Sequence, residues 1–296
     1  MDDHQRYQRY QRLVEGWLEH ALPLPDSPWP AHGMPGKLVE AMRYSVLGGG
    51  KRLRPVLLLA AHESCGGQPE DALPFAGAVE LIHTYSLVHD DLPAMDDDDL
   101  RRGRPTSHKV FGEAMAILAG DALLTLAFEW MADSPLPGAR RALAEIARRA
   151  GPTGMIAGQV GDMLATGRAA GPDMVRYIHT RKTADLITAA ILAGLLLGGA
   201  EQPALDTAAS YGLQLGLAFQ MTDDLLDLAG DPDKLGKNVH RDGQLGKLTW
   251  PRAVGVSQAR QDVLVAVEQA AALADVFQQN ARFFKSLALS IPKRVK

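Results

Sequence analysis

Apolar side chains recur at intervals of three and four residues along most of this 296-residue chain. In the segment 73–91 the residues at that spacing share one line, as in a helix that faces a core: Phe75, Val79, Ile82 and Ser86. The segment 206–228 repeats the pattern with Leu213, Leu217, Gln220, Asp224 and Leu228. Both segments are therefore predicted to be core helices, and both end in acidic residues.

Helical periodicity accounts for nearly the whole chain, because alternating runs of β-branched residues, which indicate strands, are nearly absent. Clusters of proline and glycine interrupt the pattern and leave helical segments of about 15 to 30 residues. No serine-rich or charged linker divides the sequence. The pattern predicts an all-α fold, with residues 1–296 forming a single domain.

The apolar stretch Leu186–Ala200 is predicted to be a buried helix and not a membrane span. Thr188, Gly194 and Gly198 interrupt it, and it is shorter than the roughly 20 residues that cross a bilayer. The formal net charge of −4, from 31 basic and 35 acidic side chains, gives no field that would gather nucleic acid or an anionic membrane. The single cysteine, Cys65, is typical of a reducing compartment, so we expect a cytoplasmic protein.

Carboxylates crowd the end of the first predicted core helix, in the run His89-Asp90-Asp91-Leu92-Pro93-Ala94-Met95-Asp96-Asp97-Asp98-Asp99. Acids at the C-terminal end of a helix oppose the helix dipole, so bound cations would relieve their repulsion. Taken alone, the run is also compatible with a solvated helix end. It is therefore a candidate metal site that needs support from other motifs.

The second predicted core helix ends in Asp223-Asp224-Leu225-Leu226-Asp227, where Asp223 and Asp227 lie one turn apart. All three aspartates can share one ion site, and the two acidic clusters can face each other across one cavity. Oxygen ligands without nearby cysteine or paired histidine select a hard cation, so we expect magnesium. Because magnesium often binds through one or two carboxylates plus substrate phosphates, the ligand is expected to carry phosphate.

A glycine-rich basic segment, Gly48-Gly49-Gly50-Lys51-Arg52-Leu53-Arg54-Pro55, precedes the first acidic run. Its glycines would let the backbone approach an anion while its cations supply charge, which suits a diphosphate. Its glycine spacing is not that of a P-loop, and a plain surface turn would also explain it. Further cations follow the acidic runs, so that acids and bases occur in matched sets: Arg101, Arg102, Lys182, Lys237 and Lys247.

Taken together, these motifs resemble the trans-isoprenyl diphosphate synthase (polyprenyl synthetase) family, and among its members the bacterial farnesyl diphosphate synthases. The resemblance spans roughly residues 39–252. Its motifs are Gly49-Gly50-Lys51-Arg52-Leu53-Arg54-Pro55, His83-Thr84-Tyr85-Ser86, Asp90 to Asp96, Arg101-Arg102-Gly103, Gly158-Gln159, Lys182-Thr183, Phe219-Gln220, Asp223 to Asp227 and Leu245-Gly246-Lys247.

The resemblance implies an all-α fold of about ten core helices around a deep cavity, with a homodimer as the usual assembly. It implies a set of about three magnesium ions held against an allylic diphosphate by two aspartate motifs: Asp90, Asp91, Asp96, Asp223, Asp224 and Asp227. Positions that match the allylic site are Arg101, Lys182, Thr183, Gln220, Lys237 and Lys247. Positions that match the isopentenyl diphosphate site are Lys51, Arg54, His83 and Arg102.

The implied reaction joins isopentenyl diphosphate to dimethylallyl or geranyl diphosphate through an allylic carbocation, and it needs no protein nucleophile. Charge accumulates on the leaving diphosphate, so metal ions and fixed cations should contribute most of the catalysis. Residues with such catalytic roles are Asp90, Asp91, Asp96, Arg101, Lys182, Asp223 and Lys237. Water must be excluded from the carbocation, and the glycine-rich stretch 230–246 is a candidate lid.

Product length should depend on the side chains below the first acidic motif. Tyr85 lies five residues before Asp90, or about 7.5 Å along a helix axis at 1.5 Å per residue. A bulky ring at that depth could stop a growing chain at fifteen carbons, with Ser86 beside it. The resemblance agrees, although a core tyrosine with a satisfied hydroxyl would also explain Tyr85.

Two stretches depart from the family pattern: His240-Arg241-Asp242 follows Lys237 in place of the usual glycine, and the segment 275–296 lacks the usual ending. Phe283-Phe284-Lys285 and Pro292-Lys293-Arg294 could close over the site, or the tail could be irregular. Alternative functions are a geranyl, geranylgeranyl or longer-chain synthase, a non-catalytic regulatory subunit and a structural metal-binding bundle. A terpene cyclase would not need Lys51, Arg54 and His83.

Overall fold

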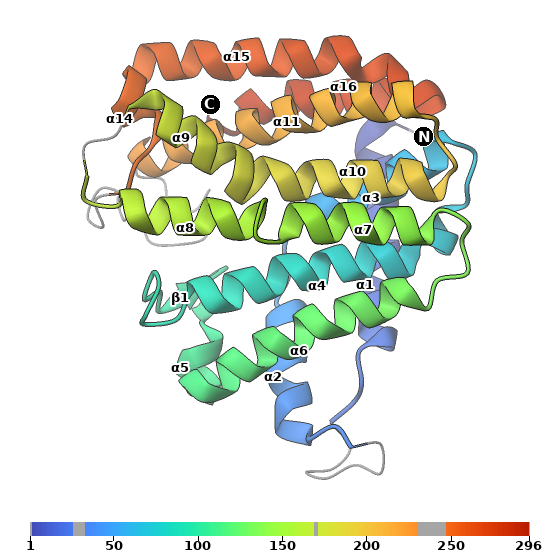
Figure 1. Ribbon diagram of the computed structural model, residues 1–296, viewed down its shortest axis with the longest axis vertical. Coiled ribbons are helices and arrows are strands. Elements are labelled where there is room, and N and C mark those ends of the chain that lie inside the picture. Colours follow the sequence, from blue (N-terminus) through green and yellow to red (C-terminus); the bar gives the residue numbers. More distant parts are fainter. Residues whose placement is uncertain (1, 26–32, 169–170, 230–246, 296) are drawn as a thin grey trace.

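A computed structural model describes residues 2–25, 33–168, 171–229 and 247–295, and these form the predicted all-α fold (Figure 1). The long helices are α1 Asp3–Ala21, α2 Gly36–Val46, α3 Leu53–Ser64, α4 Leu73–Asp90, α6 Glu113–Ala132, α7 Ala139–Ala150, α8 Met155–Ala165, α10 Asp185–Leu197, α11 Gln202–Ala229, α15 Val256–Leu273 and α16 Ala281–Ser290. Shorter ones are α5 Ser107–Phe111, α9 Pro172–Ile178 and α14 Trp250–Val254.

Short irregular elements join these helices. They are the 3₁₀ turns η1 Pro69–Ala72, η3 Ala274–Asn280 and η4 Ile291–Val295, the π-helical turn η2 His179–Ala184, and the two-residue antiparallel strands β1 Leu100–Arg101 and β2 Arg104–Pro105. The β1–β2 ribbon was not predicted, because two-residue strands leave no alternating pattern. Positive φ angles at Asp97 and Arg102 bend the chain into this ribbon directly after the first acidic motif.

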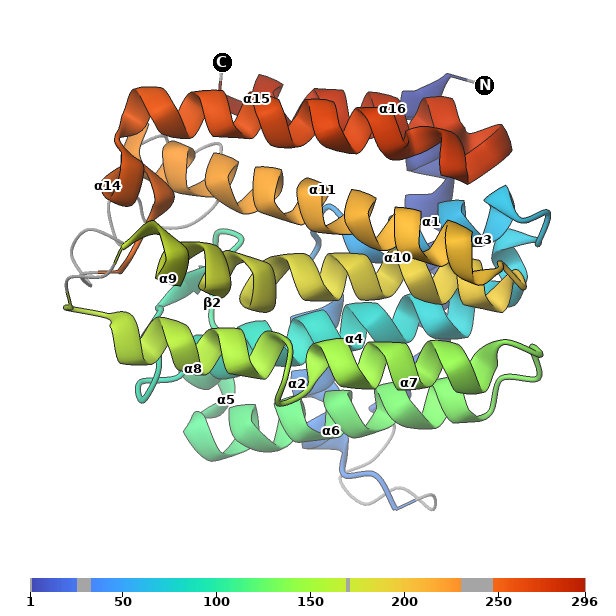
Figure 2. The same ribbon diagram turned by 45° about the horizontal axis from the view of Figure 1, so that its top comes forward.

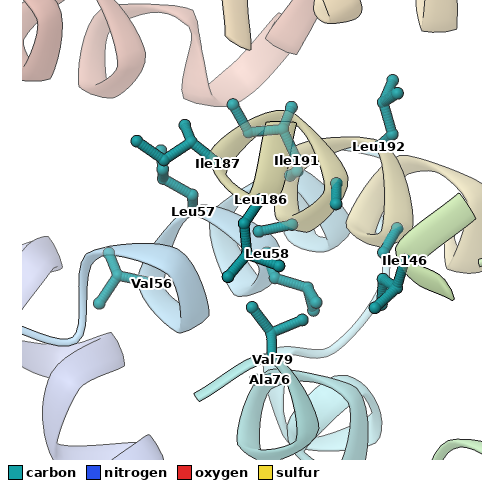
Figure 3. Close-up of a cluster of buried hydrophobic side chains, with 14 of the residues drawn as sticks. Val56, Leu57, Leu58, Ala76, Val79, Ile146, Leu186, Ile187, Ile191 and Leu192 are labelled. Atoms are coloured by element: carbon teal, nitrogen blue, oxygen red, sulfur yellow. The ribbon is translucent and has the colours of Figure 1, made fainter. Parts of the chain in front are cut away.

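The two core helices expected from periodicity are α4 and α11, and a third, α10, lies between them and fills the centre. Every residue of α10 is buried, as expected for the stretch 186–200. Leu186, Ile187 and Ile191 of α10 lie near Leu57 and Leu58 of α3 (Figure 3). A Cβ on Gly194 would sit 2.2 Å from the Leu58 carbonyl oxygen, so glycine is what permits this close approach.

The described part of the C-terminal segment is mostly helical, with a kink at Phe277 and Gln278 inside η3, and Phe283 and Phe284 do not line the cavity described below. The segment forms α16, whose Phe283 and Phe284 are buried in an aromatic cluster with Tyr10, Tyr211 and Phe277. Lys285 is exposed, and Pro292 and Lys293 belong to η4. Hydrophobic burial of two adjacent phenylalanines therefore fixes the tail against Tyr211 of α11.

Among the described helices, α6 alone is long and apolar enough to cross a membrane by length and composition, with a mean hydropathy of 1.5 over its most apolar window. Core helices of soluble proteins pass the same test, so the finding is weak evidence. The helix packs against α2, α4 and α5, and its remaining face includes the exposed Ile117 and Leu118.

Candidate active site

Most of the predicted site residues line one cavity of about 1080 Å³. Its walls come from the end of α4, the start of α3, α6, α8, η2, α11 and the segment 247–249. In Figure 2, α8, α9 and α14 lie at the end of the molecule that also carries β2, which follows the first acidic motif. The predicted residues that line the cavity are Lys51, Arg54, His83, Tyr85, Ser86, Asp90, Asp96, Arg101, Arg102, Lys182, Thr183, Gln220, Asp223, Asp224 and Lys247.

Three predicted residues do not appear in this wall. Asp91 lines a smaller adjoining pocket, and Asp227 lies one turn beyond Asp223 along α11. Lys237 and the candidate lid 230–246 fall outside the described residues. The cavity therefore unites the two halves of the predicted site from segments more than a hundred residues apart, as the sequence pattern required.

The first acidic motif folds back on itself so that two of its carboxylates face the cavity. The amide of Asp96 donates to the carbonyl of Asp90 at 2.8 Å, which turns the chain just after α4. Burial raises the pKa of Asp90 to about 6, and the neighbouring Asp96 adds to this rise while Lys182 opposes it. Although burial alone would raise the pKa of Asp96, the charges of Lys247 and Lys182 lower it. A carboxylate held above its ordinary pKa would be stabilised by a further cation, so Asp90 fits a metal ion.

Asp91 is paired with Arg101, whereas Asp90 lines the cavity. It is 3% exposed, and Arg101 donates from Nε to its Oδ1 at 3.1 Å. Arg101 also lies 3.3 Å from Asp98, so two acids hold this arginine at the cavity rim. Burial alone would lower the pKa of Arg101, but hydrogen bonding and charge from Asp91 raise it.

Asp224 in the second motif is held by three protein donors. The amide of Trp250 donates to its Oδ2 at 2.8 Å, His179 Nε2 lies 3.2 Å from the same oxygen, and Gln220 Nε2 donates to Oδ1 at 3.0 Å. Although burial alone would raise the pKa of Asp224, the charge and hydrogen bond of His179 lower it. Both oxygens of its carboxylate therefore have hydrogen-bond partners within the protein.

A shared ion site at Asp223, Asp224 and Asp227 therefore stays a prediction. Among the residues that the structure describes, no three acidic, histidine or cysteine side chains converge closely enough to hold a metal ion by themselves. The reason is that Asp224 faces His179 and Trp250. The cavity carboxylates still fit magnesium, because this ion takes one or two carboxylates and completes its shell with water and substrate phosphate.

Lys182 reaches the cavity from the π-helical turn η2. Its Nζ lies 2.7 Å from Asp162 on α8, and Asp90 and Asp96 are near enough to affect its charge. Burial alone would lower the pKa of Lys182, but these three carboxylates raise it. A Cβ on Gly158 would lie 2.2 Å from the Lys182 backbone nitrogen, so glycine brings α8 against this turn.

The π-helical turn is closed by side chains from α11. Thr183 donates to Gln220 Oε1 at 2.7 Å, and Gln220 in turn donates to Asp224, which His179 contacts. The two ends of the turn are thus joined to one stretch of α11, and Lys182 projects between them. π-helical turns occur often at functional sites because the extra residue redirects a side chain.

On the opposite wall, cations gather around His83. Arg54 is half-buried, and desolvation lowers its pKa to about 10, while Glu80 and Asp223 partly restore it. Burial also lowers the pKa of His83 well below its ordinary value, and Arg54 and Arg102 lower it further. Such a concentration of positive charge, held with too few acids, fits a diphosphate anion.

A buried ion pair shapes the segment that carries these cations. Arg52 has a positive φ of 52°, and its Nη1 donates to Glu80 Oε1 of α4 at 2.7 Å. Its Nη2 also donates to the carbonyl of Val46 at 2.8 Å. This left-handed residue starts α3 and places Lys51 and Arg54 on the cavity side.

We expect Glu80→Gln to reduce the free energy of unfolding by about 3–5 kcal/mol, because it would leave Arg52 buried without its charge partner. Chemical denaturation at neutral pH measures this change. Glu63→Gln, at an acid that is only half-buried, is the control with the smaller expected loss. Equal stability of Glu80→Gln and the unchanged protein would contradict the assigned role of the pair.

The lower part of the cavity is mainly apolar. Tyr85 is 7% exposed, and burial raises the pKa of its hydroxyl to about 12. Ser86 donates to the carbonyl of His83 at 2.8 Å. The side chains opposite are Leu124 of α6 and Ile156, Val160 and Met163 of α8. Such a wall suits a hydrocarbon chain.

Sequence reasoning missed His179 and gave Asp162 little weight. His179 opens the polar turn η2, and Asp162 lies on the largely apolar α8, where a structural role is the usual explanation. Their partners, Asp224 and Lys182, lie far along the chain or across a helix interface, so local spacing carries little signal for them.

Comparisons with known proteins identify the family of this chain. The polyprenyl synthetase family model matches residues 35–282. The farnesyl diphosphate synthase of Geobacillus stearothermophilus is 46% identical over 241 residues, which are 80% of this chain and 81% of the relative. The large subunit 1 of a heterodimeric geranylgeranyl pyrophosphate synthase from Arabidopsis thaliana is 44% identical over 259 residues, 84% of this chain and 67% of the relative.

A solved structure extends the likeness to the fold. The geranyltransferase of Helicobacter pylori, crystallised with magnesium and isoprenyl diphosphate, has a TM-score of 0.84 and 28% identity. The superposition covers 98% of this chain and 96% of that chain. Given the match over residues 35–282 and the high identity to curated relatives, this chain belongs to the polyprenyl synthetase family.

Proposed function

We propose that this protein is a magnesium-dependent prenyltransferase. It condenses isopentenyl diphosphate with dimethylallyl diphosphate and then with geranyl diphosphate, and yields (E,E)-farnesyl diphosphate and diphosphate. The observation that carries the proposal is the pairing of two acidic motifs and two groups of cations around one apolar-floored cavity. A structural metal site would need the acids but neither the second group of cations nor the apolar floor.

Magnesium would be held by the two aspartate motifs, with Asp90, Asp96 and Asp223 facing the cavity. When bound, it would neutralise charge on the allylic diphosphate and on the leaving group. A structural relative carries magnesium together with isoprenyl diphosphate, which supports this assignment. We assign Asp91, Asp224 and Asp227 to the same site as supporting acids, and a set of about three ions per site.

The chain's own cations would bind and orient the two diphosphates. The allylic diphosphate would be bound by the cations Lys182, Arg101 and Lys247 and by the uncharged Gln220 and Thr183. The Lys247 Nζ lies 2.7 Å from Asp96. We also assign Lys237 to this group. Lys51, Arg54, His83 and Arg102 bind isopentenyl diphosphate on the other wall. This division would place the isopentenyl double bond beside the allylic carbon that loses its diphosphate.

The reaction breaks the allylic carbon–oxygen bond, and the diphosphate leaves with the electron pair. Fixed cations such as Lys182 and Arg101 stabilise that charge, because they need no reorganisation as it develops. The isopentenyl double bond then supplies its electron pair to the allylic cation. The adduct loses a proton, which the released diphosphate accepts. The apolar walls exclude water that would otherwise quench the cation.

We propose Tyr85 and Ser86 as the floor that sets the product at fifteen carbons. A second candidate is a geranyl or geranylgeranyl diphosphate synthase, because the geranylgeranyl relative is almost as similar as the farnesyl one. Both candidates use the same ionising site. They differ only in how far down the cavity a hydrocarbon chain can extend.

We further propose a cytoplasmic protein in which residues 1–296 act as one domain, and which forms a homodimer and binds no nucleic acid. Exposed apolar residues of α6 and α8 that do not line the cavity support the homodimer: Ile117, Leu118 and Leu164. Burying such a surface against a second copy would remove apolar area from water. Light scattering of the purified protein tests this assembly.

Diphosphate release distinguishes the proposed activity from its rivals. We expect release only when magnesium, isopentenyl diphosphate and an allylic diphosphate are all present. Release without isopentenyl diphosphate would indicate a cyclase. No release from folded protein would favour a regulatory subunit, and magnesium binding unaffected by diphosphates would indicate a structural metal site.

A further inference from the structure

Gly120 of α6 is a buried glycine in direct contact with the His89 side chain of α4. A Cβ at this position would lie 2.1 Å from His89 Nε2 and 2.5 Å from Cδ2. Carbon atoms do not approach ring atoms so closely, so any other residue at 120 would force the imidazole from its place. Gly120 has the helical conformation of α6, so the contact and not the backbone requires glycine.

The imidazole is held by α6 through its Nε2 atom and contacts Tyr85 of its own helix α4. Its Nε2 lies 3.1 Å from the Ile117 carbonyl oxygen, so this nitrogen carries the proton and donates. The ring also meets the Tyr85 ring edge to face, with centroids 5.7 Å apart and planes at 83°. A displaced imidazole would therefore lose its hydrogen bond and press on Tyr85.

His89, Tyr85 and Asp121 all line the large cavity. His89 lies one turn above Tyr85 on α4, and helical side chains lean toward the N-terminus, so the His89 ring leans over the Tyr85 ring. Ile156 and Val160 of α8 form part of the same cavity wall. The position of His89 thus helps to set the width of the passage that a growing hydrocarbon chain uses.

We propose that Gly120 is a positioning residue for product length, which acts by giving His89 its place beside Tyr85. The inference rests on the proposed prenyl transfer and concerns the length of its product. A methyl group at 120 would push His89 toward Tyr85 and narrow the passage. The ten-carbon intermediate would then be released more often than it is extended.

The test is the product distribution of Gly120→Ala, with dimethylallyl and isopentenyl diphosphates as substrates and magnesium present. We expect the ratio of fifteen-carbon to ten-carbon product to fall about tenfold, which is the discrimination that one methylene group can produce in an apolar pocket. In the double variant His89→Ala/Gly120→Ala, the smaller side chain makes room for the methyl group. We expect that variant to recover most of the fifteen-carbon product.

Two controls separate this effect from a loss of stability. Gly77→Ala, at a buried glycine of α4 that does not line the cavity, would place its Cβ 2.0 Å from Trp17, so it should destabilise the fold without shortening the product. A Cβ at Gly16 would meet no atom within 4 Å, so Gly16→Ala should change neither the stability nor the product length. Thermal unfolding of each variant measures the stability change.

An unchanged product ratio for folded Gly120→Ala would overturn the inference, as would a shortened product that His89→Ala does not restore. If Gly120→Ala is inactive, the double variant decides: fifteen-carbon product from it supports the inference, and continued inactivity overturns it. If the unchanged protein releases no diphosphate at all, the proposed function fails instead, and that result is visible before any variant is made.

Discussion

Replacing Asp90 or Asp223 by alanine is expected to lower the rate of diphosphate release by about a thousandfold or more. Each carboxylate faces the cavity from the end of a different core helix, and a metal ion between them would lose a ligand. Losing a group that stabilises the leaving charge costs several kcal/mol in the transition state. Steady-state rates at saturating magnesium measure the effect.

The fold should survive these substitutions. For Asp90, burial raises the pKa to about 6, so its charge disfavours the folded protein without metal at neutral pH and its removal should not destabilise the fold. Asp99→Ala is the matched control, because this exposed acid of the same run pairs with Lys109 at 2.8 Å and does not line the cavity. Near-normal rates for Asp90→Ala or Asp223→Ala would remove the metal assignment.

Tyr85→Ala is expected to lengthen the product beyond fifteen carbons. The ring is 7% exposed, lines the lower cavity and packs against His89, so its removal opens space below the allylic site. A chain that can extend further gains about 0.8 kcal/mol for each methylene group that it buries. Mass spectrometry of the dephosphorylated products gives the length directly.

Tyr85→Phe is the control for this experiment, since it keeps the ring and removes only the hydroxyl. We expect its product to remain at fifteen carbons. Active Tyr85→Ala enzyme with an unchanged product would show that another side chain forms the floor. The product lengths of alanine variants at Leu124 and Met163, which also line the cavity, would then identify that side chain.

The fold and the two acidic ends were predictable because they depend on local patterns. Periodic apolar positions identified α4 and α11, and hydrophobic burial then determined that both pack in the core. The run of aspartates after α4 was conspicuous because charge is rare beside an apolar helix. The resemblance to a family added the roles of single cations such as Lys182, which spacing alone could not assign.

The sequence could not predict which aspartates are bound by other side chains of the protein. The sequence suggests equal ligands, whereas Asp91 is bound to Arg101 and Asp224 to His179, Trp250 and Gln220. These partners come from other elements, so their choice depends on tertiary packing. The π-helical turn that carries Lys182 was missed for the same reason, because its extra residue leaves no periodic signal.

Product length from dimethylallyl and isopentenyl diphosphates with magnesium tests the central claim most directly. The claim is that facing carboxylates and two sets of cations ionise an allylic diphosphate above a floor at Tyr85. Mass spectrometry of the dephosphorylated products should find a fifteen-carbon alcohol as the main species, and none when magnesium is chelated. Folded protein that forms no prenyl product under these conditions would contradict the claim.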